Sequence, residues 1–111
     1  MSATADAALR AIAHPGRRLA LHLASSRARS SGELAEACGW TRPATSQHLK
    51  VLRDAGLLRV RKQGQRRMYE ADLARVGALR AFLDDFWRGR LAELGEHIDR
   101  STGQRVDRGI R

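Results

Sequence analysis

Residues 30–56 read SSGELAEACGWTRPATSQHLKVLRDAG, and the first part of this stretch carries the boundary signals of a short helix. Ser30 is followed three residues later by Glu33, which is the signature of a capping box at a helix start. Gly39 supplies the residue type in which helices commonly end, because glycine readily adopts the left-handed backbone conformation. We therefore expect a helix between Ser30 and Gly39. Its inward stripe consists of Leu34, Ala35 and Cys38.

A second helix begins after a very short turn. Thr41 is a favourable N-cap residue, Pro43 fits the first turn of a helix, and Gly56 follows a helix that we expect to continue to Ala55. Two helices joined by a short turn that contains glycine form a helix-turn-helix, whose second helix enters the major groove of DNA. The residues expected to hold this helix to the core are Leu49, Val51 and Leu52. The residues left for its other faces include Arg42, Ala44, Thr45, Gln47, His48 and Lys50.

The segment that follows the second helix changes its apolar period to two, which predicts a β-hairpin. Residues directly opposite one another in a hairpin share a face, so the apolar side chains must be opposed. A three-residue loop at 63–65 opposes Val60 to Met68 and Arg61 to Arg67, whereas a two-residue loop that opposes Val60 to Arg67 mixes the faces. We therefore expect the three-residue loop, with its glycine in the left-handed conformation.

The positive charge of the chain is concentrated in this same region. The 111 residues contain 21 Lys and Arg against 12 Asp and Glu, a net charge of +9, and residues 40–70 alone carry eight basic residues against two acidic ones. A localised excess of this kind suits a surface that neutralises phosphates and releases counterions. The tip of the hairpin gathers four cations whose mutual repulsion is reasonable only beside an anion, so we interpret it as a wing that binds nucleic acid. These cations are Arg61, Lys62, Arg66 and Arg67.

The candidate DNA-contacting residues lie on the second helix and on the wing. Gln47 can form two hydrogen bonds with adenine and Arg42 can do so with guanine, while Thr45 or Ala44 can touch a thymine methyl group. Which of them reads bases and which contacts phosphate stays open. Thr41 and Ser46 also suit a role in helix structure, and His48 suits packing beneath the helix equally well. The full set is Thr41, Arg42, Ala44, Thr45, Ser46, Gln47, His48, Lys50, Arg61, Lys62, Gln65, Arg66 and Arg67.

Helical apolar spacing also precedes and follows the central region. We expect a first helix over residues 5–13, a second over 15–25, and a last helix from Asp72 to about Ile98. The second is expected to supply core residues Leu19, Ala20, Leu21 and Leu23. The last helix carries more apolar surface than one small core can bury, so we expect it to pack with the first helix against a second copy of the chain. The candidate dimer-interface residues are Leu9, Ile12, Leu79, Phe82, Leu83, Phe86 and Trp87.

Several classes of protein are excluded by what the sequence lacks. Cys38 is the single cysteine, so the chain has no internal disulfide and no cysteine set for a zinc finger. No apolar stretch approaches the roughly 18 residues of a membrane helix, and the apolar run after Arg17 and Arg18 is too short for an export signal. There is no phosphate-binding glycine loop and no nucleophile elbow. We expect a cytoplasmic protein that is not an enzyme, has no cofactor and does not contact a membrane.

The order of these elements resembles the ArsR/SmtB family of bacterial winged helix-turn-helix repressors. The resemblance covers about residues 8–98, in ALRAIAHPGRRLALHLA, SGELAEACGWTRPATSQHLKVLRDAGLL and RVRKQGQRRMYEA, and the run SQHLKVLRDAGLL is its most specific part. It implies a mainly α fold of about five helices plus a two-stranded wing, dimeric through the first and last helices. We place this domain at residues 1–100 and a disordered basic tail at residues 101–111.

The resemblance also implies a function, with one departure from the metal-sensing members of the family. In those members several cysteine, histidine or acidic ligands meet at one metal site. In this sequence the last helix offers only His97, with Glu93 one turn before it. A metal held by this pair across two subunits is a weaker interpretation than a solvated helix end, so the chain resembles the metal-independent branch. The expected partners are double-stranded DNA and a second copy of the chain, and no small-molecule inducer is indicated.

Three functions are consistent with these features. The leading hypothesis is a dimeric, sequence-specific repressor that binds an inverted-repeat operator in the major groove, with the basic wing on the backbone or in the minor groove. The second is a non-specific, nucleoid-like protein that binds nucleic acid through charge alone. The third is an interaction module whose last helix binds a different protein. Competition with random DNA separates the first two, and the oligomeric state tests the third.

Overall fold

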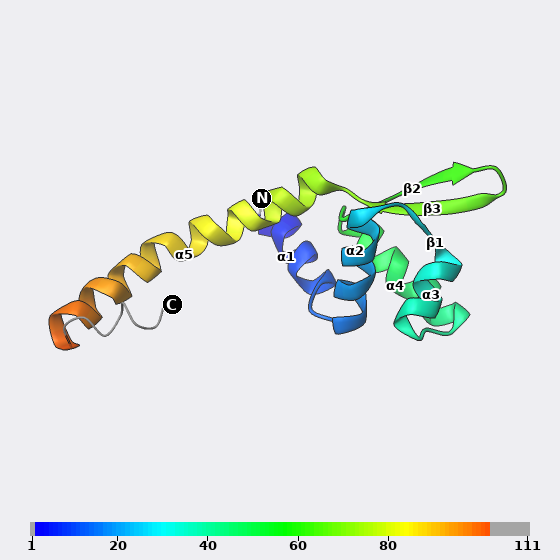
Figure 1. The fold of residues 1–111 in the computed structure, drawn as a ribbon. Coiled ribbons are helices and arrows are strands. Elements are labelled where there is room, and N and C mark those ends of the chain that lie inside the picture. The colour runs from blue at the N-terminus through cyan, green and yellow to red at the C-terminus, as the bar shows by residue number, and fades with distance from the viewer. Residues whose placement is uncertain (1, 103–111) are drawn as a thin grey trace. The chain divides into compact units, whose positions relative to one another are not determined.

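The computed structural model describes the backbone of residues 2–102 and the side chains of residues 4–95. The chain forms two compact units, which divide between Leu79 and Arg80 inside the last helix. The elements in chain order are α1 (Ser2–Ala11), α2 (Pro15–Ser26), β1 (Arg29–Ser30), α3 (Ser31–Cys38), α4 (Arg42–Asp54), β2 (Leu58–Gln63), β3 (Arg66–Ala71) and α5 (Leu73–Thr102) (Figure 1).

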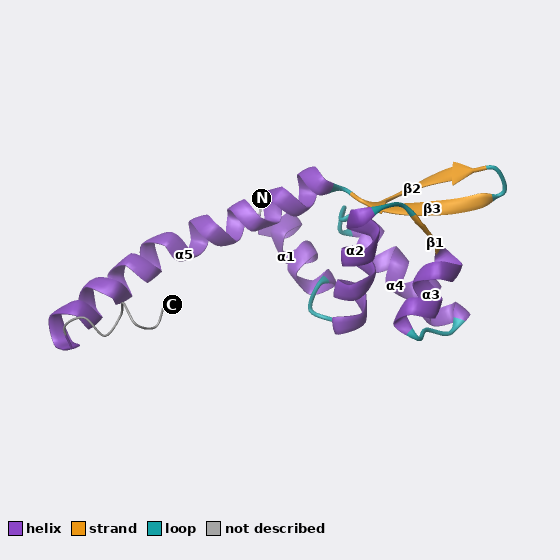
Figure 2. Ribbon diagram, in the orientation of Figure 1, coloured by secondary structure: helices purple, strands orange, loops and turns teal. Residues whose placement is uncertain are grey.

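The first unit combines helices with a small antiparallel sheet, which confirms the predicted class and adds one strand to it. The sheet has three strands in the order β1-β3-β2 (Figure 2). The additional strand consists of Arg29 and Ser30, which pair with Tyr69 and Met68 of β3. A strand of two residues has no alternation that a sequence pattern could reveal, so the sequence predicted only the two strands of the wing.

Capping residues place the helices of the helix-turn-helix where the sequence predicted them. The Ser30 hydroxyl accepts a hydrogen bond from the Glu33 backbone N–H (3.1 Å), and the Glu33 carboxylate accepts one from the Ser30 N–H (2.8 Å). Gly39 ends α3 in the left-handed conformation with φ 69°, Thr41 caps the start of α4, and Gly56 follows α4 with φ 81°. The predicted starts of both helices and the predicted end of α3 are confirmed, because capping depends on neighbouring residues alone. Helix α4 ends at Asp54, one residue before the predicted Ala55, which is its C-cap.

The core of the first unit is built from small and aliphatic side chains. Leu34, Leu52 and Leu57 are the largest fully buried residues. Two residues that the sequence placed in the core are instead at the surface, since Val51 is 38% exposed and Leu19 is 40% exposed. Other residues of the same helices, which the helical period places on the inner face, are buried instead. These are Thr45, Leu49 and Leu52 on α4 and Ala20 and Ala24 on α2.

The wing pairs in a register that differs by one residue from the expected one. Val60 is opposite Tyr69, and Gln63 is opposite Arg66, so the loop consists of two residues, Gly64 and Gln65. Gly64 has a φ of 66°, as the first central residue of a type II′ hairpin turn requires. The three-residue loop was therefore a wrong prediction.

The reason lies in which aromatic or apolar side chain of β3 enters the core. Tyr69 is only 6% exposed and shares a face with Val60, whereas Met68 is half-buried and lies on the opposite face with Arg61. The alternation of residues favoured Met68 for the core only in comparison with a loop at 63–64, which opposes Val60 to Arg67; the observed two-residue loop is at 64–65. Burial of the Tyr69 ring outweighs that of Met68, and a glycine at the first loop position permits the tight turn.

Helix α5 begins at Leu73, directly after Asp72 where the sequence placed its start, and continues past its predicted end. The Asp72 carboxylate accepts a hydrogen bond from the backbone N–H of Arg75 (3.2 Å). The helix continues to Thr102, beyond Ile98. The rest of the tail, residues 103–111, lies outside the described residues, so its predicted disorder stays a prediction.

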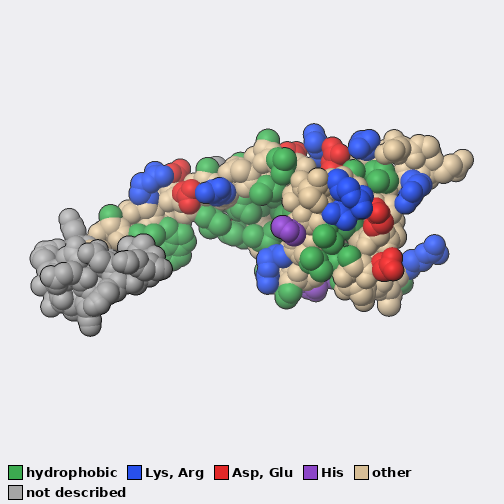
Figure 3. Space-filling model, in the orientation of Figure 1, with side chains coloured by type: hydrophobic (Ala, Val, Ile, Leu, Met, Phe, Trp, Pro, Cys, Tyr) green, Lys and Arg blue, Asp and Glu red, His purple; other side chains and the backbone are tan. Residues whose placement is uncertain are grey.

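The part of α5 in the second unit has large apolar side chains at its surface (Figure 3). The Phe82 and Phe86 rings lie 6.5 Å apart, and the Phe86 and Trp87 rings meet edge to face at 4.9 Å. Even so, Phe86 is 51% and Trp87 is 46% exposed, and Leu91 and Leu94 are more than half exposed. Of the other candidate dimer residues, Leu79 is buried, and Leu9, Ile12, Phe82 and Leu83 are half-buried.

Candidate nucleic-acid interface

The outer face of α4 presents polar side chains to solvent. Arg42, Ser46, Gln47 and Lys50 are all exposed. Lys50 forms an ion pair with Asp54 (2.8 Å) one turn later on the same helix, whereas the other three have no ion pair or side-chain hydrogen bond among the described residues. An α-helix fits the major groove of B-DNA, so these four side chains are in position to reach base edges and phosphates.

Three other candidates at the start of α4 serve the helix itself. Thr45 is 5% exposed, and its hydroxyl donates a hydrogen bond to the carbonyl oxygen of Thr41 (2.7 Å). The Thr41 hydroxyl in turn accepts from the Ala44 N–H (3.2 Å), and Ala44 is half-buried. The structure therefore places Thr45 in the core and gives the Thr41 side chain a capping role, which the sequence left open.

His48 lies against the interior side of α4, where it contacts two other rings. Its imidazole is 4.4 Å from the Trp40 ring and 4.5 Å from the His14 ring, measured between centroids. Its Nδ1 is 3.1 Å from Nη1 of Arg17. Of the two roles considered for His48, packing beneath the helix is the one that this geometry supports. Trp40, in the turn before α4, packs its ring against that of His48.

The Trp40 ring lies so close to α2 that it leaves no room for a side chain at Gly16. A Cβ added at Gly16 would lie 2.9 Å from Cζ2 and 3.0 Å from Nε1 of Trp40. Replacing Gly16→Ala should therefore lower the free energy of unfolding by about 1–3 kcal/mol, as overpacking does elsewhere, and urea denaturation measures this change. Gly77→Ala is the matched control, because an added Cβ there meets nothing within 4 Å. An equal effect of both substitutions would contradict the prediction.

The wing cations are divided between the two faces of the hairpin rather than gathered on one. Lys62 is opposite Arg67 on one face, and Arg61 lies with Arg66 on the other. All four are exposed, as is Gln65 in the loop.

One carboxylate neutralises part of this charge. Glu70 forms ion pairs with Arg59 (3.2 Å) and Arg61 (3.4 Å) at the base of the wing. In the described part of the chain, Lys62, Arg66 and Arg67 form no ion pair. The cations left without an acidic neighbour are therefore those nearest the tip.

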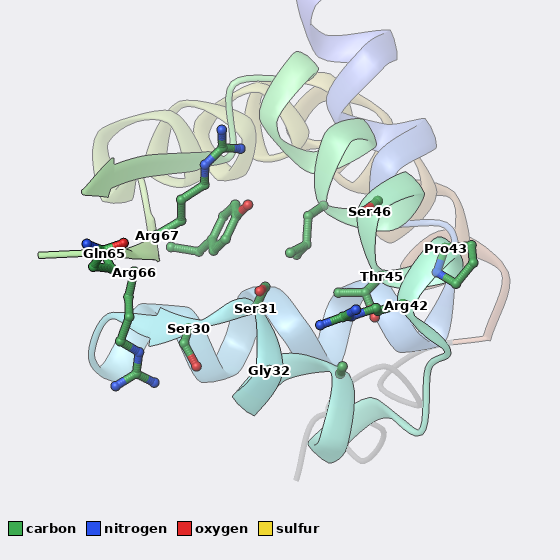
Figure 4. Close-up of a pocket in the computed structure, with 13 residues that line it drawn as sticks. Ser30, Ser31, Gly32, Arg42, Pro43, Thr45, Ser46, Gln65, Arg66 and Arg67 are labelled. Carbon is green, nitrogen blue, oxygen red and sulfur yellow. The ribbon is translucent and has the colours of Figure 1, made fainter. Parts of the chain in front are cut away.

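A groove of about 780 Å³ separates the wing from the starts of α3 and α4 (Figure 4). Its lining contains three arginines, two exposed serines and no carboxylate, so it is suited to an anion. Arg67 also lines a smaller hollow of about 260 Å³ with Lys50, Arg53 and the carboxylate of Asp54. The residues that line the larger groove are Ser30, Ser31, Gly32, Ala35, Arg42, Pro43, Thr45, Ser46, Leu49, Gln65, Arg66, Arg67 and Tyr69.

Within the described residues, the groups that could hold a metal or react as nucleophiles do not converge. Among the described side chains, no three His, Cys, Asp or Glu residues lie together. Burial raises the pKa of the Cys38 thiol, whose Sγ lies 3.6 Å from the Gly16 carbonyl oxygen. The pair of Glu93 and His97, for which the sequence favoured a solvated helix end over a metal site, includes a side chain outside the described residues, that of His97. None of the helices in the described part has the length and apolar character that a membrane crossing requires.

Comparison with known proteins identifies the family. Residues 17–61 match a family model described as a helix-turn-helix domain. The HTH-type transcriptional regulator Rv2034 of Mycobacterium tuberculosis is 40% identical over 94 residues, which cover 85% of this chain and 88% of that protein. A crystal structure of an ArsR family transcriptional regulator superposes with a TM-score of 0.72 at 27% identity, covering 84% of this chain and 94% of that one. The chain belongs to the ArsR family of winged helix-turn-helix transcriptional regulators.

A further relative bears on assembly. The winged helix-turn-helix DNA-binding domain of Mb0332 from Mycobacterium bovis, described as homodimeric and as a possible ArsR-family regulator, has a TM-score of 0.61 and 28% identity. The alignment covers 74% of this chain and 79% of that one. This ArsR-family chain thus shares its fold with a protein that is a dimer.

Two residues of the groove and one contact beneath the recognition helix were not predicted from the sequence. Ser31 and Gly32 line the groove, yet their only sequence signal was their position inside the capping box, between Ser30 and Glu33. Arg17 holds His48 from another helix, 31 positions away in the chain. A contact over such a separation has no local signature, so only the tertiary structure could reveal it.

Proposed function

We propose that this ArsR-family regulator is a homodimeric repressor that binds an inverted-repeat operator, with α4 in the major groove and the wing on the phosphate backbone or in the minor groove. The observation that carries the proposal is the groove between α3, α4 and the wing, which has three arginines and no carboxylate in its lining. The residues proposed to contact DNA are Arg42, Ser46, Gln47, Lys50, Lys62, Gln65, Arg66 and Arg67.

The exposed apolar side chains of α5 support the proposed dimer. Four large apolar side chains of its second unit are about half exposed in a single chain, and a continuous apolar stripe of this size marks an interaction surface. A second copy of the same helix offers a self-complementary stripe, as a two-fold symmetric interface requires. Two copies would present two recognition helices to the two halves of a palindromic site. A regulator of bacterial DNA would do this in the cytoplasm.

Selective binding to one DNA sequence is the direct test. We expect a duplex selected from a random pool to bind about 10³-fold or more tightly than a scrambled duplex of equal length at physiological salt. Gln47→Ala should reduce this discrimination by about 1–3 kcal/mol, because an exposed glutamine on α4 is suited to read a base edge. Fluorescence anisotropy titrations on both duplexes measure both values.

The matched control is Gln63→Ala, which removes the same amide from an exposed site on the wing. It should leave the ratio of the two affinities unchanged. Equal affinity of the wild-type protein for the selected and scrambled duplexes would rule out sequence-specific repression and favour non-specific binding.

A further inference from the structure

One guanidinium connects three segments beneath the recognition helix. Nε of Arg17 donates to the carbonyl oxygen of Ala11 (2.6 Å), and Nη2 donates to that of Arg10 (3.2 Å), both in the last turn of α1. Nη1 of the same side chain is 3.1 Å from Nδ1 of His48 on α4. Arg17 itself lies in the first turn of α2. The end of α1 and the middle of α4 are thus fixed to the same planar group.

The contact with Arg17 defines the protonation state of His48. A guanidinium has only donors, so Nδ1 of His48 must accept, and an imidazole nitrogen accepts only when it carries no proton. His14 is constrained in the same way, because its Nδ1 accepts from the backbone N–H groups of Gly16 (3.0 Å) and Arg17 (3.4 Å). The arrangement therefore requires two neutral imidazoles whose rings are 4.5 Å apart.

We propose that Arg17 is a positioning residue that holds α4 to the end of α1 through a neutral His48, and that protonation of His48 breaks this link and weakens DNA binding in acid. The inference rests on the proposed function, since it concerns how α4 is held for DNA. It assigns a role to two residues that do not face the nucleic-acid groove. It also makes the position of the recognition helix dependent on pH.

The surroundings of His48 oppose a positive charge. The charged or titratable groups that face it are His14, from the start of α2, and Arg17; Trp40, from the turn before α4, adds an apolar ring. Burial, then His14, then Arg17 hold the pKa of His48 below its usual value of 6.5. The unfolded chain therefore binds more protons than the folded one as the pH falls below 6.5, and folding stability at this site is lost in that direction.

The expected pH dependence of binding is opposite in sign to the general electrostatic effect. Protonating exposed histidines adds positive charge and should tighten binding to DNA. If His48 must be neutral in both chains of the dimer, affinity instead falls by up to about tenfold per chain for each pH unit below its pKa, or up to about 100-fold for the dimer. We expect the affinity of the wild-type protein for its selected duplex to fall about tenfold between pH 7.5 and pH 5.0 at constant salt.

Substitutions at the two histidines locate the titrating group. His48→Asn keeps an acceptor on Cγ, where Nδ1 is attached, but does not titrate, so its affinity should change by less than about threefold over the same range. His22→Asn is the control, because His22 is exposed on α2, and it should show the wild-type loss. His14→Asn keeps an N-cap acceptor. If His14→Asn removes the pH dependence and His48→Asn does not, the proposal is wrong.

Substitutions at Arg17 and at its neighbour Arg18 distinguish a positioning role for Arg17 from simple capping of α1. Nη1 of Arg18 donates to the carbonyl oxygen of Ile12 (2.8 Å), so it caps the same helix, but it forms no hydrogen bond to α4. Arg17→Lys keeps the positive charge but cannot contact Ala11, Arg10 and His48 at once. It should weaken binding to the selected duplex at pH 7.5 by about tenfold. Arg18→Lys should weaken it by less than twofold. Equal effects of both substitutions would show that Arg17 acts only as a cap.

A measurement on the protein without DNA tests the protonation of His48 independently of the proposed function. The ¹⁵N chemical shifts of the His48 ring in the free protein should show an unprotonated Nδ1 at pH 7.5 and a titration midpoint below pH 6.5. Circular dichroism at each pH establishes that the chain stays folded. A protonated Nδ1 at pH 7.5, or affinity that rises on acidification, would overturn the inference. Absence of selective binding at pH 7.5 would instead refute the proposed repressor.

Discussion

Aspartate at both Phe86 and Trp87 is expected to convert the protein into a monomer and to reduce its affinity for the selected operator at least about 100-fold, the loss that follows when two linked binding sites become independent. Both rings are about half exposed in the single chain, so the substitution should cost the monomer little. In a dimer it would place four carboxylates in an apolar interface, where unpaired charge is strongly unfavourable. Analytical ultracentrifugation and anisotropy titration measure the two effects.

The control introduces the same charge elsewhere on α5. Ala81 and Ala92 are exposed, and the helical period places both on the side away from the apolar stripe. Ala81→Asp together with Ala92→Asp should leave the dimer and operator affinity nearly unchanged. If the Phe86 and Trp87 variant still sediments as a dimer, the stripe is not the dimer interface. A monomeric wild-type protein would favour a different protein as the partner of this helix.

The sequence predicted best those features that depend on neighbouring residues. Ser30 with Glu33, Gly39, and Thr41 each determine a helix boundary through contacts within one turn, and all of them lie where the sequence placed them. The concentration of charge between residues 40 and 70 was also visible, because it is a count rather than a geometry. The family could be recognised from the sequence because its motifs, such as SQHLKVLRDAGLL, are also runs of neighbouring residues.

Features that depend on packing were predicted less well. Whether Met68 or Tyr69 enters the core determines the register of the wing, and the alternation of residues alone did not distinguish them. Thr45 is a polar residue in a basic segment, yet its hydroxyl bonds to the backbone and its methyl group is buried. Leu19 is apolar, yet alanines occupy the inward positions of α2.

The candidate interface also contains residues that could be predicted from local sequence and residues whose role depends on packing. The exposed members of α4 and the wing follow from composition and periodicity, and most of them lie where the sequence predicted. His48 differs, because its environment is created by Arg17 and His14, which are 31 and 34 positions earlier in the chain. Its role therefore depends on how α1 and α2 pack beneath α4, and only the structure could indicate it.

Neutralising the tip of the wing should weaken binding to every DNA sequence by a similar factor. Lys62, Arg66 and Arg67 have no ion pair in the described part of the chain, so each is free to displace a counterion from phosphate. With six such cations in a dimer, replacing all three by glutamine should make the slope of log affinity against log salt shallower by up to about five units. Affinity at physiological salt should fall at least about 100-fold. Titrations over a range of salt concentrations measure both.

Arg59 and Arg61 provide the comparison, because Glu70 already neutralises part of their charge. Replacing both by glutamine removes two cations per chain, yet it should change the salt slope less per charge than the substitutions at the tip. The ratio of affinities for selected and scrambled duplexes should stay constant in the tip variant, since phosphate contacts carry no sequence information. A loss of that ratio would mean that the wing reads bases. It would contradict the proposal that α4 reads the sequence while the wing contacts phosphate.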